Sequence, residues 1–381
     1  MGWQAGGQHH GAECYNLHLF TRTNSLIERA GHWFLDSGIQ ESSGGVARYY
    51  RSDLGANAGV STEITGYAVS TLLYLHQRTN QPQYLEAALR AARFLANTAW
   101  DARLGTFPFE HSKNGTQPRA LAYFFDCGII VRGLLAAWRV SKEDQLRDTA
   151  IAAGRSMAQD FRAAEAIHPI LALPDKHPLA YEARWSATPG CYQLKSAMAW
   201  YELFEATGDP EFLRAYEAAV ESALRSESSF LPGASSREQV MDRLHAYLYF
   251  LEGLLPVLDR PECVKAFRAG LDRVAAHLQE IAPIFARSDV YAQLLRARLY
   301  GESLARIPLD LHAATHEAGQ AAGFQLESSN TQVDGGFLFG RKGADALPYV
   351  NPVSTAFCLQ ALTQWDDRTD NAFEASRHVL I

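Results

Sequence analysis

Residues 190–226 read GCYQLKSAMAWYELFEATG followed by DPEFLRAYEAAVESALRS. The first part is apolar on nearly every face of a helix, whereas the second has one apolar and one charged face. A helix that is apolar all round has to be covered on all sides, while an amphipathic helix can face water. Gly208, Asp209 and Pro210 form a helix stop, a cap and a first-turn proline. This stretch therefore predicts an inner helix joined by a short turn to an outer helix.

The same pair recurs along the whole chain. The segments that are apolar nearly all round, expected to be inner helices, are 61–77, 126–141, 190–208, 242–258, 289–301 and 351–365. The amphipathic segments, expected to be outer helices, are 24–38, 82–99, 142–161, 209–226, 261–281 and 309–327. The two kinds alternate strictly, which indicates a repeat architecture. We therefore predict an all-α fold, an (α/α)6 toroid with six inner and six outer helices.

A glycine followed by alternating aromatic residues precedes three of the inner helices. The three copies are GGVARYY (44–50), LGTFPFE (104–110) and GGFLFGR (335–341). Such alternation predicts short strands or hairpins at the rim of the ring. The first and last copies match best, and their match aligns Glu63 with Ala356. The repeat itself therefore does not require the Glu63 carboxylate, although a glutamate in a first helical turn can also complement the helix dipole.

The composition limits the class of protein. The 381 residues are 47% hydrophobic and 20% charged, as in ordinary soluble globular proteins. The net charge of −7 and the dispersed Lys and Arg argue against a nucleic-acid partner, and no apolar run is long enough to span a membrane. Five scattered cysteines and the lack of a secretory signal predict a cytoplasmic protein. We expect residues 1–21 to be a poorly ordered arm and residues 22–381 to be one toroid domain.

The alternating pattern resembles a known superfamily of six-fold toroids. Its members include six-hairpin glycosidases, N-acylglucosamine 2-epimerases, uronyl carbon-5 epimerases and α/α-toroid polysaccharide lyases. The resemblance covers the chain from about residue 22 onward. It implies an active-site cavity lined by the N-terminal ends of the inner helices and by the rim segments before them. Terpenoid cyclases and protein prenyltransferases share the toroid, but the sequence has no D-x-D-D or D-D-x-x-D motif.

Four residues at the expected cavity are candidates for catalysis: Glu63, Asp126, Tyr192 and His245. In hydrolysis, Glu63 and Asp126 would form a carboxylate pair, one donating a proton and the other activating water. In epimerisation or elimination, Tyr192, His245 or Glu63 would remove a proton next to a uronate carboxylate. Purely structural roles are the alternatives, with Asp126 as a helix cap and His245 as a core residue. The residues alone do not choose among these.

The remaining cavity candidates suit an acidic or amino-sugar glycan. Aromatic rings stack on the apolar faces of sugars, and arginine binds a carboxylate through two parallel hydrogen bonds. The predicted substrate-binding residues are Arg48, Tyr49, Arg51, Tyr67, Glu110, His111, Arg184, Trp185, Lys195, Arg243, Tyr291, Asp334, Arg341 and Asn351.

We therefore expect a carbohydrate-active enzyme, a hydrolase or one with lyase-like or epimerase-like activity, with a sugar or oligosaccharide as substrate. No cofactor is expected. No metal is expected either, because His312 and His316 lie on a predicted outer helix. The alternatives are a glycan-binding or assembly protein without catalysis and a terpenoid-cyclase-like enzyme. The sequence leaves the oligomeric state open.

Overall fold

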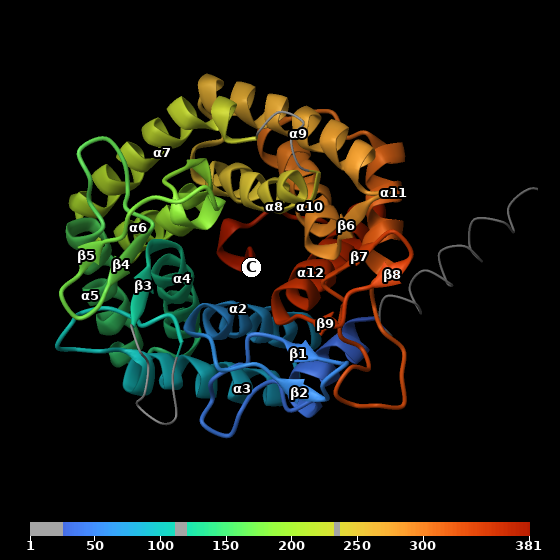
Figure 1. Ribbon diagram of the computed structural model, residues 1–381, viewed down its shortest axis with the longest axis horizontal. Coiled ribbons are helices and arrows are strands. Elements are labelled where there is room, and N and C mark those ends of the chain that lie inside the picture. The colour runs from blue at the N-terminus through green and yellow to red at the C-terminus, as the bar shows by residue number, and fades with distance from the viewer. Residues whose placement is uncertain (1–25, 111–119, 232–236) are drawn as a thin grey trace, which may run out of the picture.

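A computed structural model describes residues 26–110, 120–231 and 237–381. Two concentric sets of helices form a ring (Figure 1). The inner helices are α2 (Thr62–Thr79), α4 (Phe124–Ser141), α6 (Leu194–Thr207), α8 (Arg237–Gly253), α10 (Ser288–Ala305) and α12 (Pro352–Thr369). Each inner helix contacts the next, and α12 contacts α2 to close the ring. The predicted (α/α)6 toroid is confirmed.

The outer layer covers the ring on all sides (Figure 1). It consists of the helix at 26–36, α3 (Pro82–Phe94), α5 (Asp144–Asp160), α7 (Pro210–Phe230), α9 (Pro261–Ile281) and α11 (Leu311–Ala322). Shorter helical turns are η1 (Leu95–Ala99), η2 (Trp185–Ala187), η3 (Cys191–Gln193), η4 (Leu255–Val257) and η5 (Arg377–Val379). Among the described residues, no helix has both the length and the apolar character that a membrane span needs. The expected arm, residues 1–21, lies outside the described residues.

The helix ends follow the local sequence signals. Gly208 ends α6 with a left-handed backbone, at a φ of 72°, which glycine adopts without steric cost. The Asp209 carboxylate then accepts a hydrogen bond from the Glu211 amide at the start of α7, and Pro210 is the first helical residue. Ser61 caps α2 in the same way, by accepting from the Ile64 amide. The inner-to-outer turn predicted from the sequence is therefore confirmed.

Neighbouring inner helices touch through glycines. A Cβ added at Gly128 of α4 would lie 2.4 Å from the main-chain oxygen of Ser196 on α6. One added at Gly133 would lie 2.7 Å from the main-chain oxygen of Gly66 on α2. Both distances are shorter than real Cβ contacts, so larger residues would push the helices apart. These glycines set the small radius of this part of the ring.

Short antiparallel sheets bind the sectors together at the rim. Their strand orders are β2-β1-β9, β3-β4-β5 and β6-β7-β8. The strands are β1 (Tyr50–Arg51), β2 (Ala56–Asn57), β3 (Leu121–Tyr123), β4 (Ile170–Ala172), β5 (His177–Pro178), β6 (Phe285–Arg287), β7 (Gly340–Lys342), β8 (Asp345–Ala346) and β9 (Tyr349–Val350). The pairing of Tyr50 with Val350 joins the first sector to the last. β1 begins at the end of the predicted segment 44–50, and β7 overlaps the end of 335–341, whereas the predicted strand at 104–110 forms only isolated bridges, at Thr106 and Glu110.

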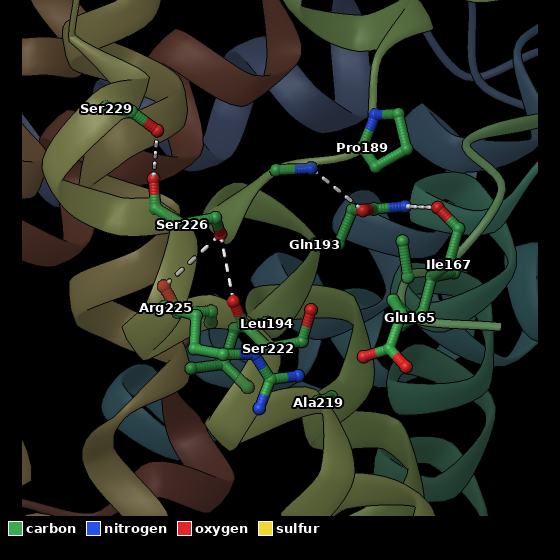
Figure 2. A pocket seen from close by; sticks show the side chains of 13 residues that line it. Glu165, Ile167, Pro189, Gln193, Leu194, Ala219, Ser222, Arg225, Ser226 and Ser229 are labelled. Atoms are coloured by element: carbon green, nitrogen blue, oxygen red, sulfur yellow. Dashed lines mark hydrogen bonds between the residues drawn. The ribbon is translucent and has the colours of Figure 1, made fainter. Parts of the chain in front are cut away.

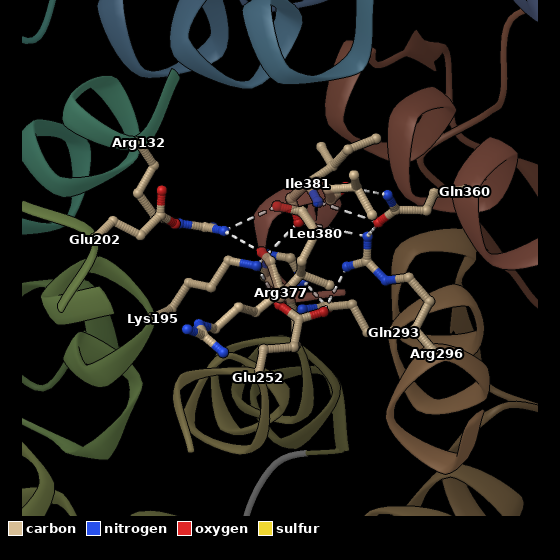
Figure 3. A network of polar contacts seen from close by, with 12 residues as sticks. Arg132, Lys195, Glu202, Glu252, Gln293, Arg296, Gln360, Arg377, Leu380 and Ile381 are labelled. Atoms are coloured by element: carbon tan, nitrogen blue, oxygen red, sulfur yellow. Dashed lines mark hydrogen bonds and ion pairs between the residues drawn. The ribbon is translucent and has the colours of Figure 1, made fainter. Parts of the chain in front are cut away.

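The centre of the ring holds buried charges and the last residues of the chain (Figure 3). Glu202 lies between Arg132 and Arg139, at 2.8 Å from each. Glu252 likewise pairs with Lys195 and Arg296. Each carboxylate thus faces two cations, and Arg132, Lys195 and Arg296 among these cations are buried.

Oxygens of the last two residues accept hydrogen bonds from these buried cations. Arg132 donates to the oxygen of Leu380 at 2.9 Å, and Lys195 donates to that of Ile381 at 2.9 Å. Gln360 accepts from the Ile381 amide and also from Arg296. Burial nevertheless lowers the pKa of Lys195 to about 7, and the charges of Arg132 and Arg296 add to this effect. The segment is therefore an integral part of the core.

Replacing Glu252 with Gln should destabilise the protein strongly. The substitution leaves Lys195 and Arg296 buried without a compensating negative charge, and breaking a buried pair costs about 3–5 kcal/mol. We expect a loss of this size in the free energy of unfolding, measured by urea denaturation.

Glu238→Gln on the same helix is the matched control. Its partner Lys342 is largely exposed, so the loss should stay within about 1 kcal/mol. Equal losses for the two variants would contradict the importance of the central charges.

Candidate functional site

Two carboxylates come together at the starts of neighbouring inner helices. Glu63 lies in the first turn of α2, and Asp126 lies in the first turn of α4. Neither caps its helix, because Ser61 holds the cap position of α2 and Tyr123 holds that of α4. Asp126 is buried, and its Oδ2 atom has no hydrogen-bond partner among the described residues. The alternative of Asp126 as a helix cap is therefore wrong.

Burial and mutual repulsion keep protons on this carboxylate pair. Burial raises the pKa of Glu63 to about 7. Burial raises the pKa of Asp126 well above its usual range, and the charge of Glu63 raises it further. The positive charge of Arg48 opposes both shifts. A coupled pair of this kind can hold a single proton near neutral pH, so that one group donates while the other accepts.

Rim segments hold Arg48 beside the pair. The Arg48 amide donates to the oxygen of Gly59 at 3.0 Å, which fixes the strand next to the start of α2. Its guanidinium lies 5.0 Å from the centre of the Phe109 ring and 3.6 Å from a carboxylate oxygen of Glu110. Glu110 itself forms a bridge with Ser61. Two of the predicted rim segments therefore place an arginine and a third carboxylate at the same helix start.

Aromatic side chains line the ring next to the carboxylates. Tyr249 of α8 and Phe125 of α4 have ring centres 4.6 Å apart, and Tyr67 of α2 meets Phe357 of α12 at 5.5 Å. Burial raises the pKa of Tyr67 and Tyr249 well above the usual value, and the charge of Glu63 contributes to both shifts. These hydroxyls therefore stay protonated and can donate hydrogen bonds.

His245 of α8 is held by a polar chain from α10. Its Nδ1 atom is 2.6 Å from Oε1 of Gln293 and 3.4 Å from Oδ2 of Asp289. Arg287 in turn holds Asp289 by two hydrogen bonds, at 2.9 and 2.6 Å. Burial lowers the pKa of His245 to about 4, so the imidazole is neutral at neutral pH. With two acceptors at Nδ1, the proton belongs on that atom and the Nε2 lone pair is available.

Tyr192 borders the same aromatic wall but is not a poised base. Its hydroxyl donates to the main-chain oxygen of Thr188 at 3.2 Å, and burial raises its pKa well above the usual value. Trp185 packs edge-on against it, at 5.0 Å between ring centres. Burial also raises the pKa of Tyr123, and the charge of the exposed Arg184 opposes the rise in both tyrosines. Tyr192 therefore fits a wall or hydrogen-bonding role better than the predicted role of base.

Three of the predicted substrate-binding residues have other partners inside the ring wall. Lys195 is fully buried against Glu252 in the central charge network. Tyr291 packs toward the outer layer, against Phe324. Asn351 caps α12. Nothing in these contacts links the three side chains to the carboxylate pair.

The other predicted residues lie on the rim or outside the described chain. Arg243 donates to main-chain oxygens of Phe230 and Ala183, Asp334 pairs with Arg29, and Arg341 donates to the oxygen of Gly323. Tyr49 and Arg51 both contact Tyr349 of β9. His111 lies outside the described residues.

Sequence reasoning missed three residues at the site: Tyr123, Phe125 and Gln293. Tyr123 is the last residue of β3, and Phe125 lies in the first turn of α4, directly before Asp126. Gln293 follows Asp289 by four positions, so both lie on one face of α10. The four-residue spacing of Asp289 and Gln293 could have been recognised in the sequence, whereas nothing in the sequence indicated the direction of the Phe125 side chain.

Two cavities on the outer wall are separate from this site. Glu165, Gln193 and Ser226 help to line one of about 340 Å³ (Figure 2). A second, of about 830 Å³, runs along α5 and α7. None of the predicted site residues lines either cavity. Within the described part of the chain, no group of three or more His, Cys, Asp or Glu side chains is arranged to hold a metal ion.

No protein-family model and no curated protein sequence matches the chain. Solved structures match over most of its length. Cellobiose 2-epimerase from Spirochaeta thermophila DSM 6192 has a TM-score of 0.69 at 16% identity, over 91% of this chain and 98% of that one. D-mannose isomerase has a TM-score of 0.68 at 10% identity, over 90% of this chain and 97% of the isomerase.

Unsaturated glucuronyl hydrolase from Bacillus sp. GL1, responsible for the degradation of glycosaminoglycan, has a TM-score of 0.64 at 14% identity. That similarity covers 90% of this chain and 96% of the hydrolase. At such identities the comparisons establish the fold alone, and they agree with the predicted (α/α)6 toroid.

The free energy of unfolding should depend on pH because Glu63 binds its proton more tightly in the folded chain than in the unfolded chain. The folded pKa of about 7 exceeds the usual 4.5, so between these values the folded chain binds more protons than the unfolded chain. The stabilising contribution of the Glu63 proton is therefore fully present below about pH 4.5 and is lost as the pH rises through 7. Relative to Glu63→Gln, the unfolding free energy of the wild type should fall over this window in urea titrations. Parallel pH profiles for the two proteins would refute the raised pKa.

Proposed function

We propose that this chain is a sugar-processing enzyme that hydrolyses a glycosidic bond with Asp126 and Glu63 as proton donor and acceptor. The observation that carries the proposal is the coupled carboxylate pair at the starts of α2 and α4, with both pKa values raised. Glycosidases need such a pair, with one carboxyl group protonated and the other ionised at the working pH.

Their surroundings separate the two roles. Asp126 is the more buried carboxyl group, and the charge of Glu63 favours its protonated form. It would protonate the leaving oxygen of the glycosidic bond. Glu63 is less buried, and Arg48 stabilises its ionised form. It would activate water or stabilise the positive charge that develops on the sugar ring.

The charges around the carboxylate pair favour an acidic sugar. Arg48 and Arg184 bring positive charge to its surroundings, and arginine pairs with carboxylate through two parallel hydrogen bonds. Phe109 and Trp185 add aromatic surface next to these arginines. A purely hydrocarbon substrate such as an isoprenoid would offer the two carboxyl groups no hydrogen-bonding partner. The sugar-processing activities named for the structural neighbours agree with a glycan substrate.

A second candidate function is epimerisation or isomerisation of a sugar. The observation that favours it is the neutral His245, whose Nδ1 atom faces Gln293 and Asp289. Its free Nε2 could remove a proton from a carbon next to a carbonyl group. Two of the structural neighbours named above are an epimerase and an isomerase.

Removing either carboxylate should slow hydrolysis strongly. We expect Glu63→Gln and Asp126→Asn each to lower kcat by about 10²–10⁴-fold, because general acid–base catalysis contributes that much. The double variant should be little worse than either single one, since the pair acts as a unit. The measurement is the release of reducing ends from uronate-containing oligosaccharides.

The exposed Glu238→Gln is the control and should retain full activity. Binding of the oligosaccharide with no turnover by the wild type would favour a glycan-binding protein instead.

Deuterium uptake tests the second candidate. Proton removal from carbon by His245 would place solvent deuterium in the recovered monosaccharide or disaccharide, and His245→Gln would stop the uptake while Glu63→Gln would alter it less. If the enzyme hydrolyses its substrate instead, no deuterium enters at carbon, and Glu63→Gln lowers the rate of product formation more than His245→Gln does. Mass spectrometry of the products in heavy water distinguishes the two outcomes.

A further inference from the structure

The outer helix α7 carries a charge pattern that neither the ring nor the candidate site uses. Glu211, Arg214, Ala218, Glu221 and Arg225 are spaced alternately by three and four residues. This spacing puts them in one stripe along the helix. All five line the cavity of about 830 Å³ between α7, α5 and residues 161–167.

The charges in the stripe are exposed and weakly paired within their own helix. Arg214 lies 3.6 Å from Glu211, and Arg225 lies 3.9 Å from Glu221. Pairs of this kind in water contribute little to stability, so they can exchange partners at small cost.

The stripe is complementary to itself when it is read in the opposite direction. An antiparallel copy centred on Ala218 places Glu211 opposite Arg225, and it places Arg214 opposite Ser222, about 1.5 Å along the axis from Glu221. Each of these pairs occurs twice by symmetry, and the two Ala218 residues face each other on the axis. A two-fold interface requires a surface that matches itself in this manner.

We propose that α7 packs antiparallel against α7 of a second copy of this chain, with the two-fold axis at Ala218. Small residues border the stripe on the cavity side, namely Ala215, Ala219 and Ser222. They let two helix backbones approach closely, and the spacing of three and four matches the shallow crossing of helices packed in this class. The 21-residue helix is about 31 Å long, so the two helices can run side by side over that length.

The chemistry of the cavity argues for a second copy over other occupants. Its lining includes four arginines, Arg155, Arg162, Arg214 and Arg225, and four acids, Glu165, Asp209, Glu211 and Glu221. The signs balance, so the lining favours neither a polyanion nor a polycation. Its aromatic members Phe161, Trp200 and Phe212 are all buried, so they present no stacking face to a sugar. A self-complementary protein surface fits these properties.

A cysteine on the proposed axis provides a direct test. Ala218→Cys should form a disulfide with its symmetry mate under mild oxidation, because the two Cα atoms approach within about 7 Å. Ser222→Cys is the matched control, since a shift of four residues on each antiparallel helix separates the thiols by about 12 Å along the axis. The wild type under the same oxidation gives the background from native cysteines.

The expected result on a non-reducing gel is a covalent dimer for the Ala218 variant, well above the Ser222 variant and the wild type. Equal cross-linking of the two variants would overturn the register.

A charge exchange tests the pairing itself. Glu211→Arg alone and Arg225→Glu alone each put like charges face to face twice, and should raise the dimer dissociation constant by about tenfold or more in analytical ultracentrifugation. The two substitutions together restore opposite signs across the axis and should recover dimerisation. If the wild type sediments as a monomer at all concentrations, or if the double variant is no better than the single ones, the proposal falls.

Discussion

The need to cover the inner helices on every side is the constraint on which the rest of this structure depends. Helices α4 and α10 bury residues on all faces, so a single amphipathic partner could not hide them. Closing six such helices into a ring and surrounding them with six amphipathic ones satisfies all of these faces together. Glycines such as Gly128 and Gly133 then let the inner helices come close enough for the ring to be narrow.

Closure of the ring puts polar groups where water is scarce, and this has two consequences. Deeper in the ring, cations and carboxylates such as Lys195 and Glu252 must satisfy each other, and the main-chain oxygens of the C-terminal segment complete their hydrogen bonds (Figure 3). At the helix starts, Glu63 and Asp126 lack enough partners to remain fully ionised, so their pKa values rise. The burial that is costly for stability is thus also what raises the pKa values on which the proposed roles of Glu63 and Asp126 depend.

The outer layer is under the opposite constraint. Each outer helix buries one face and leaves the other in water, where its charges have little effect on the fold. The outward face of α7 is therefore free to carry a pattern such as its alternating charge stripe without changing the ring. The starts of the inner helices and the charge stripe on α7 lie in different layers. Substitutions in the stripe should therefore change the proposed self-association without changing the candidate site.

The sequence by itself determined the architecture, because period and amphipathicity are local properties of each segment. Boundaries were less accurate where apolar residues were buried without being helical. The inner segment expected at 242–258 is α8 at Arg237–Gly253, since the apolar residues that follow it form the turn η4 around Pro256. The sequence also placed Glu63 and Asp126 in the first turns of inner helices, where the structure has them, because helix starts are marked by local signals.

Only the tertiary structure decided which polar residues face the site. Lys195 stands in the first turn of an inner helix, as Asp126 does, yet it is directed into the core because Glu252 and the main chain of Ile381 lie there. The pairing of His245 with Gln293 depends on the rotation of α8 against α10, which no local pattern encodes. Leu380 and Ile381 follow no helical period, and two tertiary interactions hold them in the ring: their apolar side chains are buried in the core, and their oxygens accept hydrogen bonds from buried cations (Figure 3).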